Sequence, residues 1–225
     1  MARHLDLEEQ EQLDDLKHFW NQYGNLITWF LIAVFGSFAA WNGWQYWQRS
    51  QAVQASVLYD EVERAAAGGD TARVEQAFKD IQDKFGRTTY AQQAGLLAGR
   101  MLAEQGKTDA AKAALQWVAS DASDAGYQSL ARLRLAGLLV QNKAYDDALK
   151  QLASGISKEF EPLAADRRGD IYNLQGKRDQ AKAEYLKAWQ GFTADSDYRT
   201  LVEVKLAALG AEVPTTKPQA ESAKS

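Results

Sequence analysis

The sequence contains no cysteine, two histidines and three prolines in 225 residues. Without cysteine, the chain has no disulfide framework, thiolate metal site, cysteine nucleophile or lipid-modified cysteine anchor. Both histidines, His4 and His18, lie near the N-terminus, which excludes a histidine base in the rest of the chain. Because Pro214 and Pro218 fall in the last dozen residues, only one proline interrupts the body, which favours helices over a turn-rich β fold.

Charge is distributed unevenly along the chain. Residues 1–24 carry two basic and six acidic side chains, residues 25–48 carry no charge, and residues 49–210 carry basic and acidic side chains in equal number. The net charge of −4 therefore belongs to the short N-terminal segment. An acidic chain without a basic stripe argues against general nucleic-acid binding, so we predict no nucleic-acid partner.

The uncharged segment predicts a membrane anchor over residues 25–48. Within it, Leu26–Trp47 is almost entirely apolar, small or aromatic, and its helical length of roughly 33 Å matches a bilayer core. A leader as long and as acidic as residues 1–24 is atypical of a cleaved signal peptide, so we predict an uncleaved anchor in the lipid bilayer. Aromatic side chains expected at the two interfaces are Trp20 and Tyr23 at one end and Trp41, Trp44 and Trp47 at the other.

Small residues line one face of the anchor at spacings of 3, 4 and 3: Ala33, Gly36, Ala40 and Gly43. They predict close packing against another membrane helix. The alternative is that glycine and alanine are simply common in membrane helices. Orientation does not follow from charge, because Lys17 on one side and Arg49 and Arg64 on the other are too evenly balanced.

The sequence after Arg49 contains internal repeats at helical spacing. Ala111, Ala148 and Ala181 serve as anchors; twelve positions before them stand the small residues Gly99, Ala136 and Gly169, and four positions after them Leu115, Leu152 and Tyr185. A weaker unit uses Val74 as its anchor, with Val62, Phe78 and Ile81 at matching offsets. Small residues allow two antiparallel helices to approach, and larger apolar residues stack one hairpin on the next.

The repeats therefore predict an all-α chain, with a degenerate tetratricopeptide-like helical-hairpin array over residues 49–209. Residues Tyr198–Leu209 are expected to form a closing helix, and residues 210–225 a disordered tail. The predicted turns are 105–109, 141–146 and 175–179, where Gly or Asn ends one helix and Thr or Asp caps the next.

Three motifs are better explained by structure than by chemistry. The triplet Gly106-Lys107-Thr108 resembles the end of a phosphate-binding loop, but Met101 stands where that loop needs glycine. The charges at 166–170 are interpreted as i,i+4 pairing plus solvated surface rather than a ligand site. The two histidines stand far apart in the leader without further ligands, so they do not predict a metal site. We predict no catalytic residues, no cofactor and no metal.

The remaining candidate is a partner-binding face on the first helices of the hairpins. Exposed apolar residues in such a groove favour apolar segments of a partner chain. Arrays that clamp a C-terminal carboxylate use Lys and Asn on this face, and Leu96 and Arg100 do not match that pattern. The alternative is that neighbouring helices or the tail cover these side chains. The predicted face comprises Leu96, Arg100, Leu130, Leu133, Val140, Asp170 and Leu174.

Two local segments and the order of the parts resemble the ancillary SecYEG translocon subunit family of Gram-negative bacteria. The segments are 43–47 (GWQYW, with Gln51 beyond) and 165–170 (ADRRGD), followed by the turn 175–181. The resemblance covers about residues 5–209. It implies an inner-membrane protein with a cytoplasmic N-terminus and periplasmic repeats. It also implies partners, namely the SecYEG translocon and a membrane-anchored periplasmic chaperone of the prolyl-isomerase type, and it supplies no catalytic residues.

Three functions are therefore compatible with the sequence. The first is a non-enzymatic adaptor that passes newly translocated, unfolded client proteins to periplasmic chaperones. The second is a regulator whose acidic segment, residues 1–24, restrains a cytoplasmic stress-response factor. The third is an envelope-assembly scaffold unconnected with export.

Overall fold

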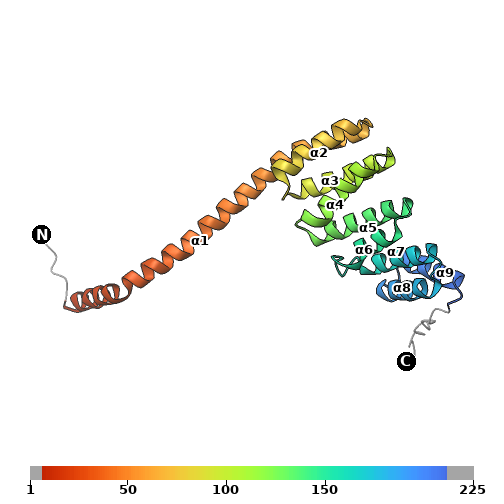
Figure 1. The fold of residues 1–225 in the computed structure, drawn as a ribbon. Helices are drawn as coiled ribbons and strands as arrows, with labels where there is room; N and C mark the ends of the chain where they lie inside the picture. Colours follow the sequence, from red (N-terminus) through yellow and green to blue (C-terminus); the bar gives the residue numbers. More distant parts are fainter. Residues whose placement is uncertain (1–6, 212–225) are drawn as a thin grey trace, which may run out of the picture. The chain divides into compact units, whose positions relative to one another are not determined.

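The computed structural model describes residues 7–211 (Figure 1). Over this range it contains helices and no strand, which confirms the predicted all-α fold. The chain divides into two compact units, residues 1–51 and 52–225, with α1 contributing to both. The helices are α1 (Leu7–Ala67), α2 (Thr71–Phe85), α3 (Thr89–Glu104), α4 (Thr108–Asp121), α5 (Ala125–Gln141), α6 (Tyr145–Ala153), α7 (Glu161–Leu174), α8 (Arg178–Gly191) and α9 (Asp197–Ala208).

In the second unit, consecutive helices from α2 to α9 pack against one another (Figure 1). The predicted hairpins are α3–α4, α5–α6 and α7–α8. Helix α5 also contacts both α3 and α7, so the first helices of successive hairpins form a continuous layer. This arrangement is typical of a helical-repeat array, in which each repeat contacts mainly its neighbours.

The repeat anchors lie where the sequence predicts close helix packing. Ala111, Ala148 and Ala181 are fully buried. A Cβ atom on Gly99 would lie 2.6 Å from Leu115 Cγ, and one on Gly169 would lie 2.5 Å from Tyr185 Cδ1. Because glycine has no side chain, it leaves a space on the first helix, and a large side chain of the second helix fills that space.

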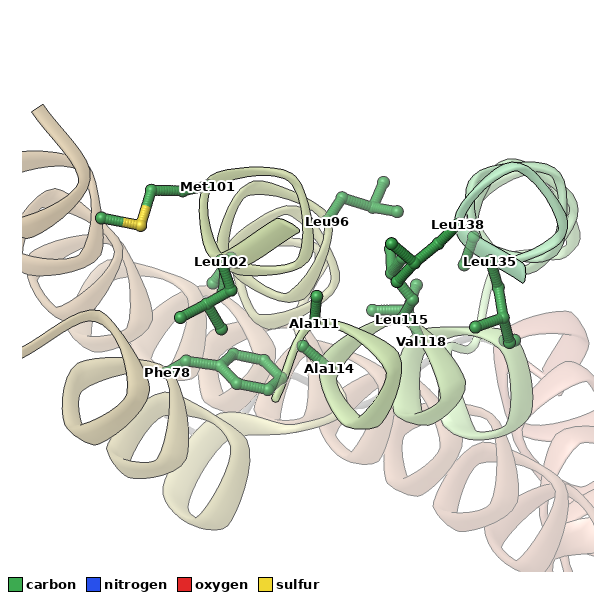
Figure 2. Close-up of a cluster of buried hydrophobic side chains, with 14 of the residues drawn as sticks. Phe78, Leu96, Met101, Leu102, Ala111, Ala114, Leu115, Val118, Leu135 and Leu138 are labelled. Carbon is green, nitrogen blue, oxygen red and sulfur yellow. The ribbon is translucent and has the colours of Figure 1, made fainter. Parts of the chain in front are cut away.

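A continuous apolar core runs from the C-terminal part of α1 to α7. Figure 2 shows its central part, where Leu102 and Phe78 lie near the small residues Ala111 and Ala114 of α4. The weaker first repeat is confirmed, because Val62, Val74 and Ile81 are fully buried and Phe78 is nearly so.

The hairpin turns share one backbone conformation. Gly106, Gly176 and Lys143 have φ values of 72°, 75° and 59°. At each turn the next backbone N–H reaches the carbonyl five residues earlier, as in Lys107 N to Leu102 O at 2.8 Å. Such a left-handed residue satisfies the carbonyls that a helix end leaves free.

One predicted detail of the turns is confirmed and another is wrong. Asn142 ends α5 as predicted, with a φ of −88°, and the left-handed residue of this turn is the following Lys143. The expected Thr and Asp caps do not form, since α4, α6 and α8 begin after Lys107, Ala144 and Lys177 without a side-chain capping bond. The turn is so tight that Thr108 and Asp109 already lie inside the first turn of α4.

The closing helix is confirmed as α9, shifted by one residue from the predicted range. Val202 and Leu206 are fully buried against a second apolar cluster that includes Tyr185 and Trp189. The helix thus covers the apolar face of the last hairpin, as a terminal repeat must. The predicted disordered tail lies outside the described residues from residue 212 onward.

Candidate functional site

Within the described residues, one helix is long and apolar enough to cross a membrane. Only 6% of its apolar segment is buried inside the fold. Bulky apolar side chains such as Trp29, Phe35 and Phe38 face outward. The aromatic residues predicted at the interfaces are exposed as well: Trp20, Tyr23, Trp41, Trp44 and Trp47. In water such a surface would be costly, whereas hydrocarbon is a suitable solvent for it.

Polar side chains in this helix bond to its own backbone. Thr28 Oγ1 donates to Gly24 O at 2.7 Å, Ser37 Oγ to Ala33 O at 2.7 Å, and Asn42 Nδ2 to Phe38 O at 2.8 Å. Each bond removes a donor that lipid could not satisfy. These three polar side chains are therefore compatible with a bilayer.

The predicted helix-packing face is open in the first unit. Ala33, Gly36, Ala40 and Gly43 are all exposed, and a Cβ on Gly36 or Gly43 would meet no atom within 4 Å. The face is free to be approached by another helix, and its use for this purpose stays a prediction.

The residues predicted for the partner-binding face divide into three groups. Arg100 and Leu174 are exposed, and Leu130, Val140 and Asp170 are half-buried. Leu96 and Leu133 are core residues, with only 6% and 8% of their surface exposed, and Figure 2 shows Leu96 among the buried side chains. These two are therefore not accessible to a partner in this fold. Binding at the remaining five stays a prediction.

The repeat register explains why Leu96 and Leu133 are buried. Each stands three positions before the small residue of its first helix, so both lie on the side of that helix that packs closely. Asp166 holds the same place in the last repeat. Arg134 follows Leu133 by one position and Leu130 by four, which puts it on the accessible face beside Leu130. A shift of one residue turns a side chain by about 100° around a helix, enough to move it from core to surface.

The accessible face also carries Arg134, which lies close enough to Arg100 to feel its charge. Arg134 Nη1, from α5, donates to Leu96 O of α3 at 3.1 Å. Leu96 lies one helical turn before Arg100 in α3. Burial, and then the neighbouring charge of Arg100, lower the pKa of Arg134. Both groups stay charged, because an arginine is protonated at any physiological pH. Arg134 is absent from the face predicted from the sequence, although its place four residues after Leu130 indicates the same side of the helix.

Asp170 belongs to an ionic network at the end of the array. Its Oδ1 accepts from Lys205 Nζ at 2.7 Å and from Tyr185 Oη at 2.8 Å, and Arg167 lies 3.5 Å from Oδ2. Lys205 Nζ also donates to Asp166 Oδ1 at 2.7 Å. These bonds occupy Asp170 within the fold.

The charge cluster at 166–170 differs from its prediction as solvated surface. Asp166 is 1% exposed, and burial raises the pKa of its carboxyl, while Lys205 opposes that shift. Arg168 donates to Glu184 of α8 at 2.7 Å and to Glu161, about two turns earlier in α7, at 2.6 Å. The first pair joins two helices and the second joins distant turns of one helix. Only the contact between Arg167 and Asp170 is a short-range helical pair. The cluster mainly fastens α7 to α8 and α9.

The other rejected motifs have plain structural positions. Gly106-Lys107-Thr108 forms the turn from α3 into α4. Among residues 13–211, no three His, Asp or Glu side chains are grouped as a metal site would require. His4 lies outside the described residues.

Comparison with known proteins gives consistent matches along most of the chain. A family model described as a tetratricopeptide repeat-like domain matches residues 17–211. A protein of Neisseria gonorrhoeae named ancillary SecYEG translocon subunit is 32% identical over 210 residues, covering 93% of this chain and 100% of that protein. Proteins of the same name from Escherichia coli and Haemophilus influenzae are 27% and 29% identical, covering 81% and 82% of this chain and 85% and 90% of their own lengths.

Proposed function

The chain belongs to the ancillary SecYEG translocon subunit family, and from this premise we propose that it is a non-enzymatic, single-pass membrane adaptor associated with the SecYEG translocon. The observation that carries the proposal is the joint match of an apolar anchor and a helical-repeat domain to translocon subunits along nearly the whole chain. A repeat array offers an extended surface for binding polypeptides, which suits an adaptor better than an enzyme.

We propose that residues 25–48 cross the inner membrane, with residues 1–24 in the cytoplasm. The repeat domain, residues 49–209, and the tail, residues 210–225, then lie in the periplasm. In the anchor, the open face of Ala33, Gly36, Ala40 and Gly43 supports close packing against a neighbouring membrane helix. The exposed aromatic residues at its two ends support placement at the lipid–water interfaces.

The finer part of the proposal is that the repeat domain passes newly translocated proteins to a periplasmic chaperone. The chaperone would be membrane-anchored and of the prolyl-isomerase type, and the clients would be unfolded. Tethering supports this role, because an anchor beside the channel holds the array at a high effective concentration where chains emerge. Weak contacts with the accessible first-helix face, including Arg100, Leu130, Val140 and Leu174, are then sufficient.

Affinity purification from native membranes tests this function. The full chain, tagged at its C-terminus and gently solubilised, is expected to recover translocon subunits and a periplasmic chaperone. A matched control replaces residues 25–48 by an unrelated membrane helix, and we expect it to recover less translocon. Paired substitutions Gly36→Leu and Gly43→Leu should have the same effect, whereas Phe35→Leu, on another face, should not. Absence of export components while the translocon stays intact would refute the assignment and favour an envelope-assembly scaffold.

A second candidate function follows from the acidic segment. Residues 1–24 carry the whole net charge of −4, a surface suited to holding a basic cytoplasmic factor. Deletion of residues 2–16 separates the two functions. If translocon recovery persists while a stress response changes, the segment restrains a regulator. If neither changes, the segment has no regulatory role.

A further inference from the structure

Two arginines from neighbouring first helices, Arg100 and Arg134, are both exposed on the accessible face. The bond from Arg134 Nη1 to Leu96 O, at 3.1 Å, holds a side chain of α5 against the backbone of α3. Residues four apart lie on the same side of a helix, so Arg100 projects beside this contact. The lowered pKa of Arg134, caused by burial and then by Arg100, agrees with this closeness.

The positive charge of this pair is poorly balanced within the fold. Arg100 has one ion pair, with Glu104 at 3.7 Å, and the two side chains are 63% and 65% exposed. Arg134 has no carboxylate within ion-pair distance among residues 13–211. By contrast, Arg168 is held by two carboxylates and Arg167 by Asp170. Local excess of one charge attracts a ligand of the opposite charge.

The surroundings leave room for such a ligand and limit its chemistry. Gly137 stands at the place in its repeat that Arg100 has in the preceding one, and a Cβ there would meet no atom within 4 Å. Half-buried Leu97 and Leu130 provide apolar surface on the same two helices. A guanidinium carries five N–H donors, and only one bond of Arg134 is used. The arrangement favours carboxylates that alternate with apolar side chains.

We propose that Arg100 and Arg134 bind side-chain carboxylates of an acidic, partly apolar segment in a partner polypeptide. The inference rests on the proposed adaptor function, because it names the chemistry of the segment that the first-helix face accepts. The face continues over α3, α5 and α7, so it accommodates a segment that runs along it instead of a chain end. Bidentate pairs between guanidinium and carboxylate supply both attraction and orientation.

Peptide binding by the full chain in detergent micelles tests the proposal. The probe is a fluorescent peptide of alternating Glu and Leu, acetylated and amidated at its ends, and the matched peptide has Gln in place of Glu. We expect the Glu peptide to bind about tenfold more tightly than the Gln peptide, a difference that shrinks as salt rises. The paired substitutions Arg100→Gln and Arg134→Gln should remove this preference.

Single substitutions sharpen the test. Arg134→Lys keeps the charge but loses the planar fork, so its affinity should fall between the wild-type and Gln values. Glu104→Gln should strengthen binding, because it removes the competing carboxylate. Arg178→Gln changes an exposed arginine at the start of α8 and should have no effect. Circular dichroism melting confirms that each variant is folded.

Several outcomes would overturn the inference: equal binding of the two peptides, unchanged binding by the paired Gln variant, or binding only when the peptide has a free C-terminal carboxylate. Binding to phosphatidylglycerol vesicles without binding to the peptide would indicate a lipid site instead. Translocon recovery is measured in the same variants. If recovery persists while the peptide fails to bind, the inference falls and the adaptor function stands; if the wild type binds the peptide but recovers no translocon, the reverse holds.

Discussion

Lys205 Nζ in the closing helix lies 2.7 Å from Asp166 Oδ1 in α7, across 39 residues of sequence. Asp166 occupies the place in the last repeat that Leu96 and Leu133 occupy in the two preceding ones. In those repeats leucine packs into the apolar core, whereas at the end of the array a buried carboxylate meets a lysine from α9. The closing helix therefore contacts the last repeat through an ion pair at the position where the preceding repeats have a buried leucine.

Breaking this pair on one side should cost stability, because it leaves a buried charge without its partner. We expect Lys205→Met to lower the free energy of unfolding by about 3 kcal/mol, since Asp166 and Asp170 both lose their lysine. The double variant with Asp166→Leu, which restores the residue of the earlier repeats, should recover most of this loss. Urea unfolding and hydrogen exchange of the α9 amides measure the effects. A double variant no more stable than Lys205→Met would contradict the explanation.

Glu184 should make stability depend on acidity. Burial raises the pKa of its carboxyl, but hydrogen bonds from Lys187 and Arg168 outweigh burial and leave the pKa below its usual value. A carboxyl with a lowered folded-state pKa stabilises the fold above its unfolded pKa, and the stabilisation is lost as the pH falls through the folded value. Glu184→Gln should therefore cost about 2 kcal/mol at neutral pH, and the difference from wild type should shrink below about pH 4.3.

The control for this pH dependence is Asp147→Asn, because Asp147 and Lys150 form an ion pair on the surface, with side chains 60% and 75% exposed. Its removal should barely change stability at any pH. Urea unfolding of the full chain in detergent across a pH series compares the variants. A difference between wild type and Glu184→Gln that stays constant down to strongly acidic pH would refute the assigned role of Glu184.

Gly169 should not tolerate a side chain, whereas Gly137 should. An added Cβ at Gly169 would lie 2.5 Å from the Tyr185 ring, so Gly169→Ala is expected to destabilise the fold by about 1–3 kcal/mol. Gly137→Ala meets open space and should stabilise α5 by up to about 1 kcal/mol. Thermal and urea unfolding test both, and opposite signs are the expected result. Equal changes in stability at the two sites would show that helix packing does not determine the effect of the added methyl group.

In the turn between α5 and α6, glycine should increase the stability of the fold at position 143 and decrease it at position 142. Lys143 has a φ of 59°, a conformation that costs a side-chain-bearing residue about 1 kcal/mol, so Lys143→Gly should gain that amount. Asn142 has a φ of −88° and donates from Nδ2 to Leu138 O at 2.8 Å, so Asn142→Gly should lose stability. Denaturant midpoints of the two variants are expected to move in opposite directions from wild type.

Much of the fold could be predicted because it follows from local spacing. Ala111, Ala148 and Ala181 recur as anchors, each with a small residue twelve positions earlier. The two helices of every hairpin need small residues where they approach closely, so the pattern repeats with each hairpin. The membrane segment was equally predictable, because an uncharged, apolar stretch of this length has few alternatives. The turn residues were less predictable, since Lys143 shows that hairpin geometry can impose a left-handed conformation on an unfavourable residue.

The sequence by itself determined the helices, their repeat and the anchor, because periodicity and apolar length depend only on residues close in the chain. Tertiary structure alone decided which residues of the first helices are accessible. Leu96 and Leu133 are buried because a neighbouring helix covers them, and Arg134 bonds to the backbone of α3 because α5 packs on α3. It also paired Lys205 with Asp166 across 39 residues. Contacts of this kind depend on how helices distant in the sequence pack together, and local sequence patterns carry no information about that packing.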